Sequence, residues 1–138
     1  MAILITWWLW YIGSHTAVVF ANAWYDIVIV DNLSNTNIDV AEKINSLVPH
    51  PIPFYECDIR DKTHLSQIFE QKSIDAVIHF AALKAVGESC EKPFDYYDNN
   101  ILETVSLLEV MNIKKKKKMV FSSSATVYDP TGNPPFLE

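Results

Sequence analysis

Short apolar runs and longer amphipathic segments alternate along the chain. The apolar runs are rich in β-branched residues and predict buried strands at residues 2–6, 26–31, 54–57, 74–80 and 119–121. Between them, apolar residues recur at helical spacing and predict helices over residues 11–23 and 38–48, after Asp61 or Thr63, and from Pro93 onward. This alternation is typical of an α/β fold, a doubly wound parallel sheet of about five strands with helices on both faces.

The spacing also predicts which side of each helix is buried. The first helix is expected to pack through Ile12, Ala17, Val18, Val19, Phe20 and Ala23. The long helix after Pro93 is expected to pack through Ile101, Leu102, Val105, Leu108 and Met111. Residues 81–91 and 129–138 are expected to be connections without regular structure.

Composition and charge narrow the class of protein. With 138 residues, 49% of them hydrophobic, the chain is long enough for one domain, residues 1–138, with its own core. The net charge of -6 argues against a nucleic-acid binder, because such domains are usually basic. No apolar run approaches the roughly 20 residues of a membrane span. Cys57 and Cys90 have no metal-site spacing and are expected to be buried free thiols of a cytoplasmic protein.

Acidic residues end two of the expected strands. Parallel sheets bind ligands at the carboxyl ends of their strands, where the strand order reverses. Asp31 ends the second strand, where a carboxylate can accept hydrogen bonds from both hydroxyls of a ribose. No arginine follows it in residues 31–34, which favours NAD over NADP. Asp58 ends the third strand and can accept a hydrogen bond from an adenine amine, but either aspartate can also simply initiate a turn.

Four further polar features lie within or near the other expected strands. Lys84 follows the fourth strand, where it can reach a ribose or a diphosphate, or remain a solvated loop residue. Ser122, Ser123 and Ser124 follow the fifth strand, where a serine can hydrogen-bond a substrate hydroxyl. His79 lies within an apolar strand and is interpreted as a hydrogen-bonded core residue. The lysine run at residues 114–118 is interpreted as a solvated helix end.

The turn after the first strand has an unusual composition. A strand, a tight turn and a helix at residues 3–13 form the unit that binds phosphate in dinucleotide-binding proteins. Here the turn contains Trp7, Trp8 and Trp10, and Gly13 is its single glycine. Glycines in such a turn permit positive φ and let backbone N–H groups approach a pyrophosphate. The indoles therefore predict very weak NAD binding, or none.

Five sequence blocks, residues 11–16, 31–35, 77–89, 96–100 and 121–128, resemble the UDP-glucose 4-epimerases, which are extended short-chain dehydrogenase/reductases with a Rossmann-type domain. The resemblance covers nearly the whole chain. It implies an NAD that takes a hydride from C4 of a UDP-hexose and returns it to the other face of the 4-keto sugar, the isomerisation of UDP-glucose and UDP-galactose in galactose metabolism.

The resemblance also implies roles for individual residues. Tyr11, Ile12 and Gly13 would lie at the pyrophosphate, and Asp31, Asn32, Leu33, Asn35 and Thr36 around the adenosine ribose. Asp58 and Ile59 would hold the adenine. Phe80, Ala81, Ala82, Lys84 and Asn99 would line the cofactor. Ser124 would hydrogen-bond the 4-hydroxyl of the sugar as a catalytic residue, and Lys84 and Ser124 would contact the substrate. No residue is expected to bind a metal.

The chain departs from the family at several positions. The family pattern has glycine at positions 7, 10 and 13, and also usually at the positions of Trp24 and Glu103. A catalytic Tyr-x-x-x-Lys pair is expected beyond Glu138, together with the sugar-binding part, so residues 1–138 are expected to be a partial, truncated domain that is inactive by itself. An exposed edge strand next to indoles also makes a homodimer possible.

Two alternatives to this interpretation stay open. The chain can be a non-catalytic, engineered Rossmann core whose cofactor groove is filled by tryptophan side chains. It can also belong to a related nucleotide-sugar dehydratase or decarboxylase, although the block at residues 79–89 argues against this alternative.

Overall fold

A computed structural model describes residues 1–6, 11–34, 37–80 and 82–123; residues 7–10, 35–36, 81 and 124–138 lie outside the described set. The strands are β1 (Ala2–Thr6), β2 (Asp26–Asp31), β3 (Phe54–Glu56), β4 (Ile74–His79) and β5 (Lys118–Phe121). The helices are α1 (Tyr11–Asn22), α2 (Asp39–Asn45), α3 (Lys62–Gln71), α4 (Val86–Glu91), α5 (Pro93–Tyr96), a π-helical segment η1 (Tyr97–Leu102) and α6 (Glu103–Ile113).

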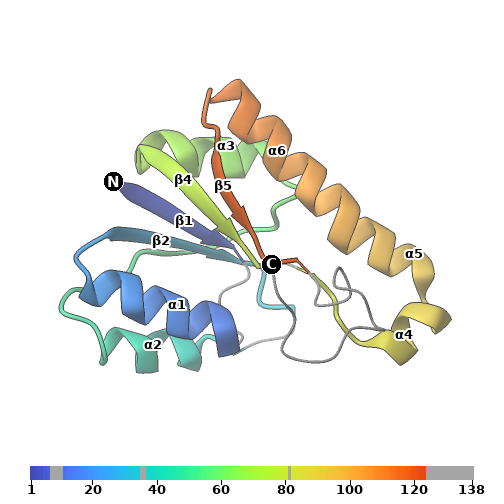
Figure 1. The fold of residues 1–138 in the computed structure, drawn as a ribbon, viewed down its shortest axis with the longest axis horizontal. Coiled ribbons are helices and arrows are strands. Elements are labelled where there is room, and N and C mark those ends of the chain that lie inside the picture. The colour runs from blue at the N-terminus through green and yellow to red at the C-terminus, as the bar shows by residue number, and fades with distance from the viewer. Residues whose placement is uncertain (7–10, 35–36, 81, 124–138) are drawn as a thin grey trace, which may run out of the picture.

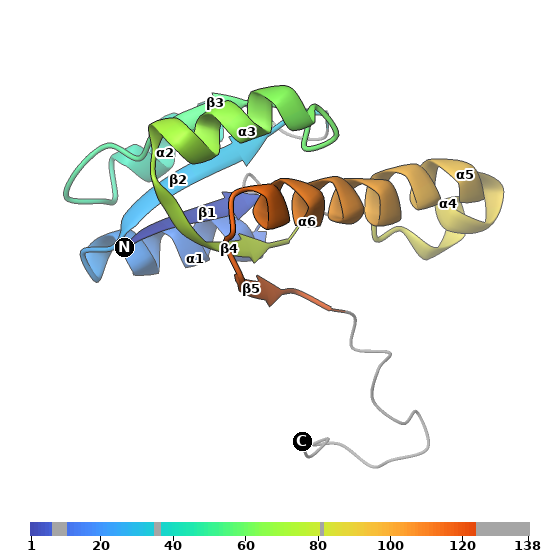
Figure 2. The ribbon, with the colours of Figure 1, turned by 90° about the horizontal axis from the view of Figure 1, so that it is seen from above.

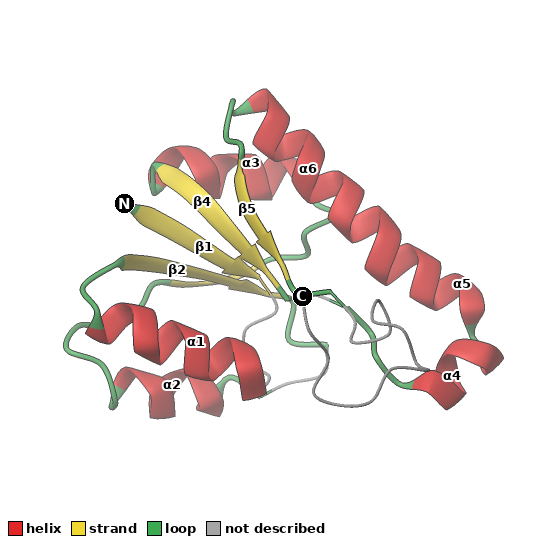
Figure 3. Cartoon of the chain, viewed as in Figure 1, coloured by secondary structure: helices red, strands yellow, loops and turns green. Residues whose placement is uncertain are grey.

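The described strands form one parallel sheet in the order β3-β2-β1-β4-β5. Because β1 lies between β2 and β4, the direction in which the sheet grows reverses next to it. Figure 3 shows the arrowheads converging on one edge of the sheet, with helices flanking the strands. The sequence-based prediction of a doubly wound parallel sheet is confirmed.

Each face of the sheet has its own core. Alternate residues of a strand point to opposite faces, so Leu4 packs in the core beneath α3 and α6, whereas Ile3 and Ile5 pack in the core beneath α1 and α2. Continuous apolar strands such as β2 are therefore explained by helices on both faces.

Helix α1 packs through a narrower face than we expected. Its buried residues are Gly13, Ala17 and Ala21, which recur every four positions and let the helix lie close to the sheet. Of the residues expected to pack, Ala17 is buried and Val18 and Phe20 pack against the core, whereas Ile12, Val19 and Ala23 are exposed. The apolar spacing missed Gly13 and Ala21 because the side chains that allow close packing are small.

Helix α1 ends in a Schellman motif that contains a tryptophan. The Tyr25 N–H donates to the Phe20 carbonyl at 3.1 Å and the Trp24 N–H to the Ala21 carbonyl at 3.0 Å. Trp24 has a φ of 62°, the left-handed conformation that favours glycine at this position. The rings of Phe20 and Tyr25 make the apolar contact of the motif, with centroids 5.3 Å apart.

The prediction for the buried face of the long helix after Pro93 was right at Met111 and wrong at the other four residues. The structure buries Glu103, Ser106, Leu107, Val110 and Met111. It leaves Ile101, Leu102, Val105 and Leu108 exposed. The helix has apolar side chains on two faces. The wide π-helical turns of η1 also rotate the residues after it, relative to those before it, away from the face that spacing in an α-helix predicts. Figures 1 and 2 show α5, η1 and α6 as one rod that extends beyond the sheet.

Two smaller predictions are also corrected. Residues 81–91 were expected to lack regular structure, but Val86–Glu91 form the short helix α4, with Tyr96 donating a hydrogen bond to the Ala85 carbonyl at 2.8 Å. Cys57 is buried as expected, whereas Cys90 is exposed because α4 presents no buried residue to the core. Burial, and the negative charges of Asp61 and Asp58, raise the pKa of the Cys57 thiol to about 11.

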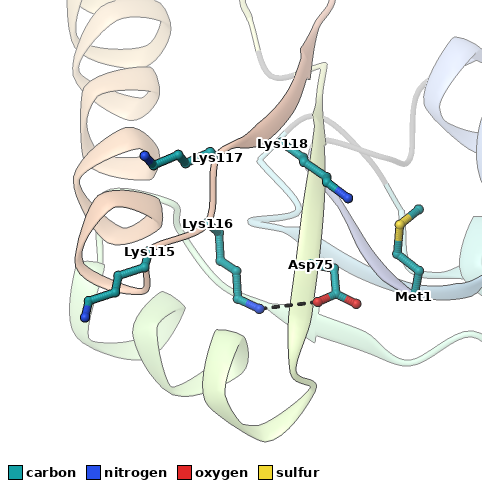
Figure 4. A pocket seen from close by; sticks show the side chains of 6 residues that line it. All are labelled: Met1, Asp75, Lys115, Lys116, Lys117 and Lys118. Atoms are coloured by element: carbon teal, nitrogen blue, oxygen red, sulfur yellow. Dashed lines mark hydrogen bonds and ion pairs between the residues drawn. The ribbon is translucent and has the colours of Figure 1, made fainter.

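The lysine run links α6 to β5 at the amino edge of the sheet. Lys114 pairs with Glu70, and Lys116 Nζ lies 3.3 Å from Asp75 Oδ1. Asp75 also accepts a hydrogen bond from the Ala2 N–H at 3.2 Å. Figure 4 shows Lys115 and Lys117 pointing away from Asp75. The run therefore ties the starts of β1, β4 and β5 together, which the interpretation as a solvated helix end did not include.

Candidate functional site

The candidate site lies at the carboxyl edge of the sheet. Thr6, Asp31 and His79 are the last residues of β1, β2 and β4, and all three are buried. The strand order reverses between β1 and β4, which is where open α/β sheets bind their ligands. The structure thus gathers residues that are far apart in the sequence along one edge.

His79 joins the two strands at this reversal. Its Nδ1 lies 2.7 Å from Thr6 Oγ1, and its Nε2 lies 3.1 Å from Thr104 Oγ1. The Thr104 hydroxyl donates to the Asn100 carbonyl at 2.7 Å, so it accepts from His79 and the ring proton is on Nε2. Nδ1 then accepts from the Thr6 hydroxyl. Burial lowers the pKa of His79 to about 4, and its interpretation as a hydrogen-bonded core residue is confirmed.

The same chain of hydrogen bonds reaches the connection after β4. The Asn100 side chain accepts from the Leu83 N–H at 2.7 Å and donates to the Leu83 carbonyl at 3.0 Å. This two-point contact fixes the backbone between Ala82 and Lys84, both predicted to line a cofactor. Lys84 itself is exposed. Phe80 packs against the core beneath α1 and α2. Asn99, a predicted cofactor residue, donates to the Asp95 carbonyl at 2.8 Å.

Two consecutive Asx turns, made by Asp31 and Asn32, follow β2. Asp31 Oδ1 accepts a hydrogen bond from the Leu33 N–H at 2.9 Å, and Asn32 Oδ1 accepts one from the Ser34 N–H at 3.1 Å. Leu33 has a φ of 56°, so the backbone turns sharply after the strand. Asp31 therefore initiates a turn and stands at the carboxyl edge.

The connection after β3 contains an ion-pair network. Asp58 Oδ1 accepts from the Arg60 N–H at 2.8 Å and from Nε at 3.0 Å, while Oδ2 accepts from Nη2 at 2.6 Å. Arg60 Nη1 donates to Asp98 of η1. The hydrogen bonds from Arg60 lower the pKa of Asp58, and they raise the pKa of Arg60. Asp58 thus caps a turn, while Ile59, its predicted partner at the adenine, is buried in the core.

Glu103 is the acidic residue that the sequence interpretation did not place in the site. Its side chain is 4% exposed, and it makes no hydrogen bond within the described residues. Burial, and then the negative charge of Asp58, raise the pKa of Glu103 to about 7, with Asp98 and Asp31 adding to the shift and Arg60 opposing it. The signal in the sequence was its spacing: Glu103 precedes Leu107 by four positions and Val110 by seven, so the three residues share one face of a helix.

The start of α1 lies at the same edge. Tyr11 and Ile12 are exposed there, whereas Gly13 is buried against the sheet. The Tyr11 and His15 rings meet edge to face with centroids 4.6 Å apart. Four predicted site residues, Asn35, Thr36, Ala81 and Ser124, lie outside the described residues, as do Trp7, Trp8 and Trp10.

Within the described residues, no cluster of three or more His, Cys, Asp or Glu side chains is suited to a metal ion, and no helix is long and apolar enough to cross a membrane.

A family model described as GDP-mannose 4,6 dehydratase matches residues 4–138. The chain belongs to this family. Among its relatives, a UDP-glucose 4-epimerase of Yersinia pestis is 48% identical over 138 residues, which are 100% of this chain and 41% of the relative. The bifunctional protein gal10 of Schizosaccharomyces pombe is 52% identical over 126 residues, which are 91% of this chain and 18% of that protein.

Solved structures of the family have the same fold. The UDP-glucose 4-epimerase of Stenotrophomonas maltophila, with bound NAD and formylated UDP-arabinopyranose, matches with a TM-score of 0.93 and 41% identity, over 98% of this chain and 40% of that chain. The enzyme of Bifidobacterium longum, in complex with NAD+ and UDP, gives a TM-score of 0.91 and 39% identity, over 99% of this chain and 42% of that chain. The chain therefore spans less than half the length of the epimerases that it matches.

Proposed function

We propose that this chain is the dinucleotide-binding part of a UDP-glucose 4-epimerase, which interconverts UDP-glucose and UDP-galactose with NAD. The observation that carries the proposal is the match over 98% of the chain to an epimerase with bound NAD, at a TM-score of 0.93. The reversal of strand order between β1 and β4, with Asp31 buried at the carboxyl edge, is consistent with a dinucleotide at this position.

The proposed roles follow the edge of the sheet. NAD, when bound, would accept the hydride from the sugar. Tyr11, Ile12 and Gly13 would face its pyrophosphate. The segment from Asp31 to Thr36 would hold the adenosine ribose, and Asp58 with Ile59 would border the adenine. The connection from Phe80 to Lys84, held in place by Asn100, would line the cofactor beside Asn99.

The substrate in this proposal is a UDP-hexose. Lys84 would bind it by charge, and Ser124 would hydrogen-bond its 4-hydroxyl and orient the departing proton. No Tyr-x-x-x-Lys sequence occurs in residues 1–138, so the proposal includes a lack of epimerase activity for this polypeptide by itself. A cytoplasmic location is also part of the proposal, since Cys57 and Cys90 are free thiols.

The three tryptophans at positions 7, 8 and 10 provide the test. We expect NAD binding weaker than micromolar in the unaltered chain, and much tighter binding once Trp7→Gly, Trp8→Gly and Trp10→Gly are combined, because the pyrophosphate needs a close approach of the backbone. Isothermal titration calorimetry measures both affinities. Trp24→Gly, a change at the far end of α1, is the matched control and is expected to leave NAD affinity unchanged.

The alternative, a non-catalytic core whose groove is filled by indoles, is favoured by the sequence of residues 7–10 alone. It predicts a large loss of stability when the three tryptophans become glycines, and no gain in NAD binding. Micromolar NAD affinity in the unaltered chain would contradict both the alternative and the expected effect of the indoles.

The proposal includes a homodimer formed through the outer apolar seam, the exposed residues Phe94, Tyr97, Ile101, Val105 and Leu108. All five lie along the α5–η1–α6 rod, and exposed apolar side chains of this kind favour packing against a second copy of the chain. Size-exclusion chromatography with light scattering tests this. A dimer that Leu108→Glu dissociates supports the seam, and a monomer at high concentration contradicts it.

A further inference from the structure

The position of Glu103 gives the candidate site a property that its proposed function does not require. The residue begins α6, and its side chain points away from solvent on the buried face that also contains Leu107 and Val110. A buried carboxylate is stable only when hydrogen bonds or an opposite charge compensate for the lost water. Within the described residues, Glu103 has no hydrogen bond of this kind.

The charges that face Glu103 come from three elements. Asp31 ends β2, Asp58 and Arg60 belong to the connection between β3 and α3, and Asp98 lies in η1. Arg60 is the one cation in this described group, and its guanidinium is already committed to Asp58 through Nε and Nη2 and to Asp98 through Nη1. Three carboxylates and one committed cation therefore act on a buried carboxyl that has no hydrogen-bond partner among the described residues.

We propose that Glu103 makes the binding of an anionic adenine dinucleotide at this edge dependent on pH: binding is favoured while the Glu103 carboxyl is protonated and disfavoured when it ionises. The inference rests on the proposed function, because Asp31 and Asp58 are the residues assigned there to the adenosine. Glu103 acts through its charge and does not need to touch the ligand, so it is a positioning residue of the site.

The physical reason is the balance of charge at the adenosine end. With Glu103 neutral, Arg60 contributes one positive charge beside the carboxylates of Asp58 and Asp98, both of which it contacts. With Glu103 ionised, a further buried negative charge adds to those of the carboxylates in a region of low dielectric, where repulsion of a pyrophosphate is poorly screened. Binding and ionisation are reciprocal, so a bound dinucleotide must also favour the protonated form of Glu103.

The size of the effect follows from the fraction of binding-competent protein. Burial raises the pKa of Glu103 to about 7, so the protonated fraction of the protein decreases from about nine-tenths at pH 6 to about one-tenth at pH 8. We assume that this form alone binds NAD. The apparent dissociation constant then increases about tenfold over this range. The charge of the NAD pyrophosphate is the same at both pH values, so the ligand adds no titration of its own.

The experiment measures NAD affinity at pH 6 and pH 8 by isothermal titration calorimetry. It uses the full chain with Trp7→Gly, Trp8→Gly and Trp10→Gly, then the same chain with Glu103→Gln added, and a control with Glu109→Gln. The Glu103→Gln substitution keeps the size of the side chain and removes its charge. Glu109 is an exposed residue of the same helix, where it pairs with Lys62, so the control removes a carboxylate from α6 outside the site.

The proposal expects weaker NAD binding at pH 8 in the parent and in the Glu109→Gln chain, and equal binding at both pH values after Glu103→Gln. A pH dependence that persists after Glu103→Gln overturns the inference and leaves the proposed function intact. Absence of NAD binding at both pH values in all three chains overturns the proposed function, and the inference with it. The readout is a ratio of affinities within folded chains, which a purely structural role of Glu103 would not change.

Discussion

The buried carboxyl of Glu103 predicts a specific change in the stability of the chain with pH. Its pKa is about 7 in the folded chain and 4.5 when it is exposed in the unfolded chain. The folded state therefore keeps a proton that the unfolded state releases, so the stability from this residue is full below pH 4.5 and is lost as the pH rises through 7. Glu103→Gln should remove this loss.

The magnitude follows from the shift in pKa. A difference between 4.5 and about 7 corresponds to about 3 kcal/mol in the free energy of unfolding, since each unit is worth about 1.4 kcal/mol. For a chain of this length, that is a difference of about 10 °C in Tm. Glu103→Gln and the parent should be equally stable near pH 4.5, and Glu103→Gln should be more stable by about 3 kcal/mol above pH 7.

His79 makes the effect visible in a second way. Burial lowers its pKa from 6.5 to about 4, so its contribution has the opposite sign: stability is lost as the pH falls from 6.5 to 4. In the parent the two slopes cancel between about pH 4.5 and 6.5, which predicts a nearly flat profile there. Glu103→Gln removes the contribution of Glu103, so the stability of this variant should increase with pH between about 4.5 and 6.5 through His79 alone. The lowered pKa values of Asp58, Asp75 and Glu88 add a loss at lower pH to both chains.

The assay is urea unfolding at half-unit steps from pH 4.5 to 8, followed by circular dichroism, for the parent and for Glu103→Gln. Glu109→Gln again serves as the control for removal of an exposed charge on α6. A difference in stability between the parent and Glu103→Gln that is the same at pH 5 and pH 8 would refute the reasoning, because the ionisation of Glu103 would then not oppose folding.

Substitutions at two further positions test the fold, one beside the site and one at the far end of α1. Thr104→Val leaves the buried Nε2–H of His79 without its acceptor and should cost about 1–3 kcal/mol, whereas Thr104→Ser should be much milder because it keeps the hydroxyl; thermal unfolding of both variants decides this. Trp24→Gly should be about 1 kcal/mol more stable than Trp24→Ala, because both lose the indole but glycine alone adopts a φ of 62° without strain; equal Tm values would contradict this account.

The architecture was predictable because strands with continuous apolar side chains alternate with amphipathic helices. Asp31 was placed correctly at the end of a strand because the last polar residue of such a run marks its carboxyl end. The strand order was not in the sequence. It follows from which helices pack against which face, a property of the whole fold.

The buried face of α6 could not be predicted from spacing. Val105 and Leu108 have the same apolar signal as Leu107 and Val110, yet the latter pair faces the sheet. The π-helical turns of η1 shift the phase of the helix, and hydrophobic spacing measured at 3.6 residues per turn does not include such a shift.

The polar network of the site was also hidden from the sequence. Arg60 and Asp98 are 38 positions apart, and only the packing of η1 over the β3–α3 connection brings them together. Glu103 was noted in the sequence only as a departure from a usual glycine, and the charges that act on it come mostly from other elements. Asp58 was assigned by its place after a strand, which said nothing about the arginine two positions later that now holds both of its oxygens.

The hydrogen bonds from Thr6 through His79 and Thr104 to Asn100 have a practical consequence for watching this site in solution. A ring proton held between His79 and Thr104 is shielded from water, so it should exchange slowly enough to give its own downfield proton resonance. Asn100 accepts from the Thr104 hydroxyl through its carbonyl and from the Leu83 N–H through its side chain. A ligand that displaces the connection after β4 would therefore shift that resonance. The fold thus contains a natural spectroscopic probe, needing no label, beside the connection that is proposed to line the cofactor.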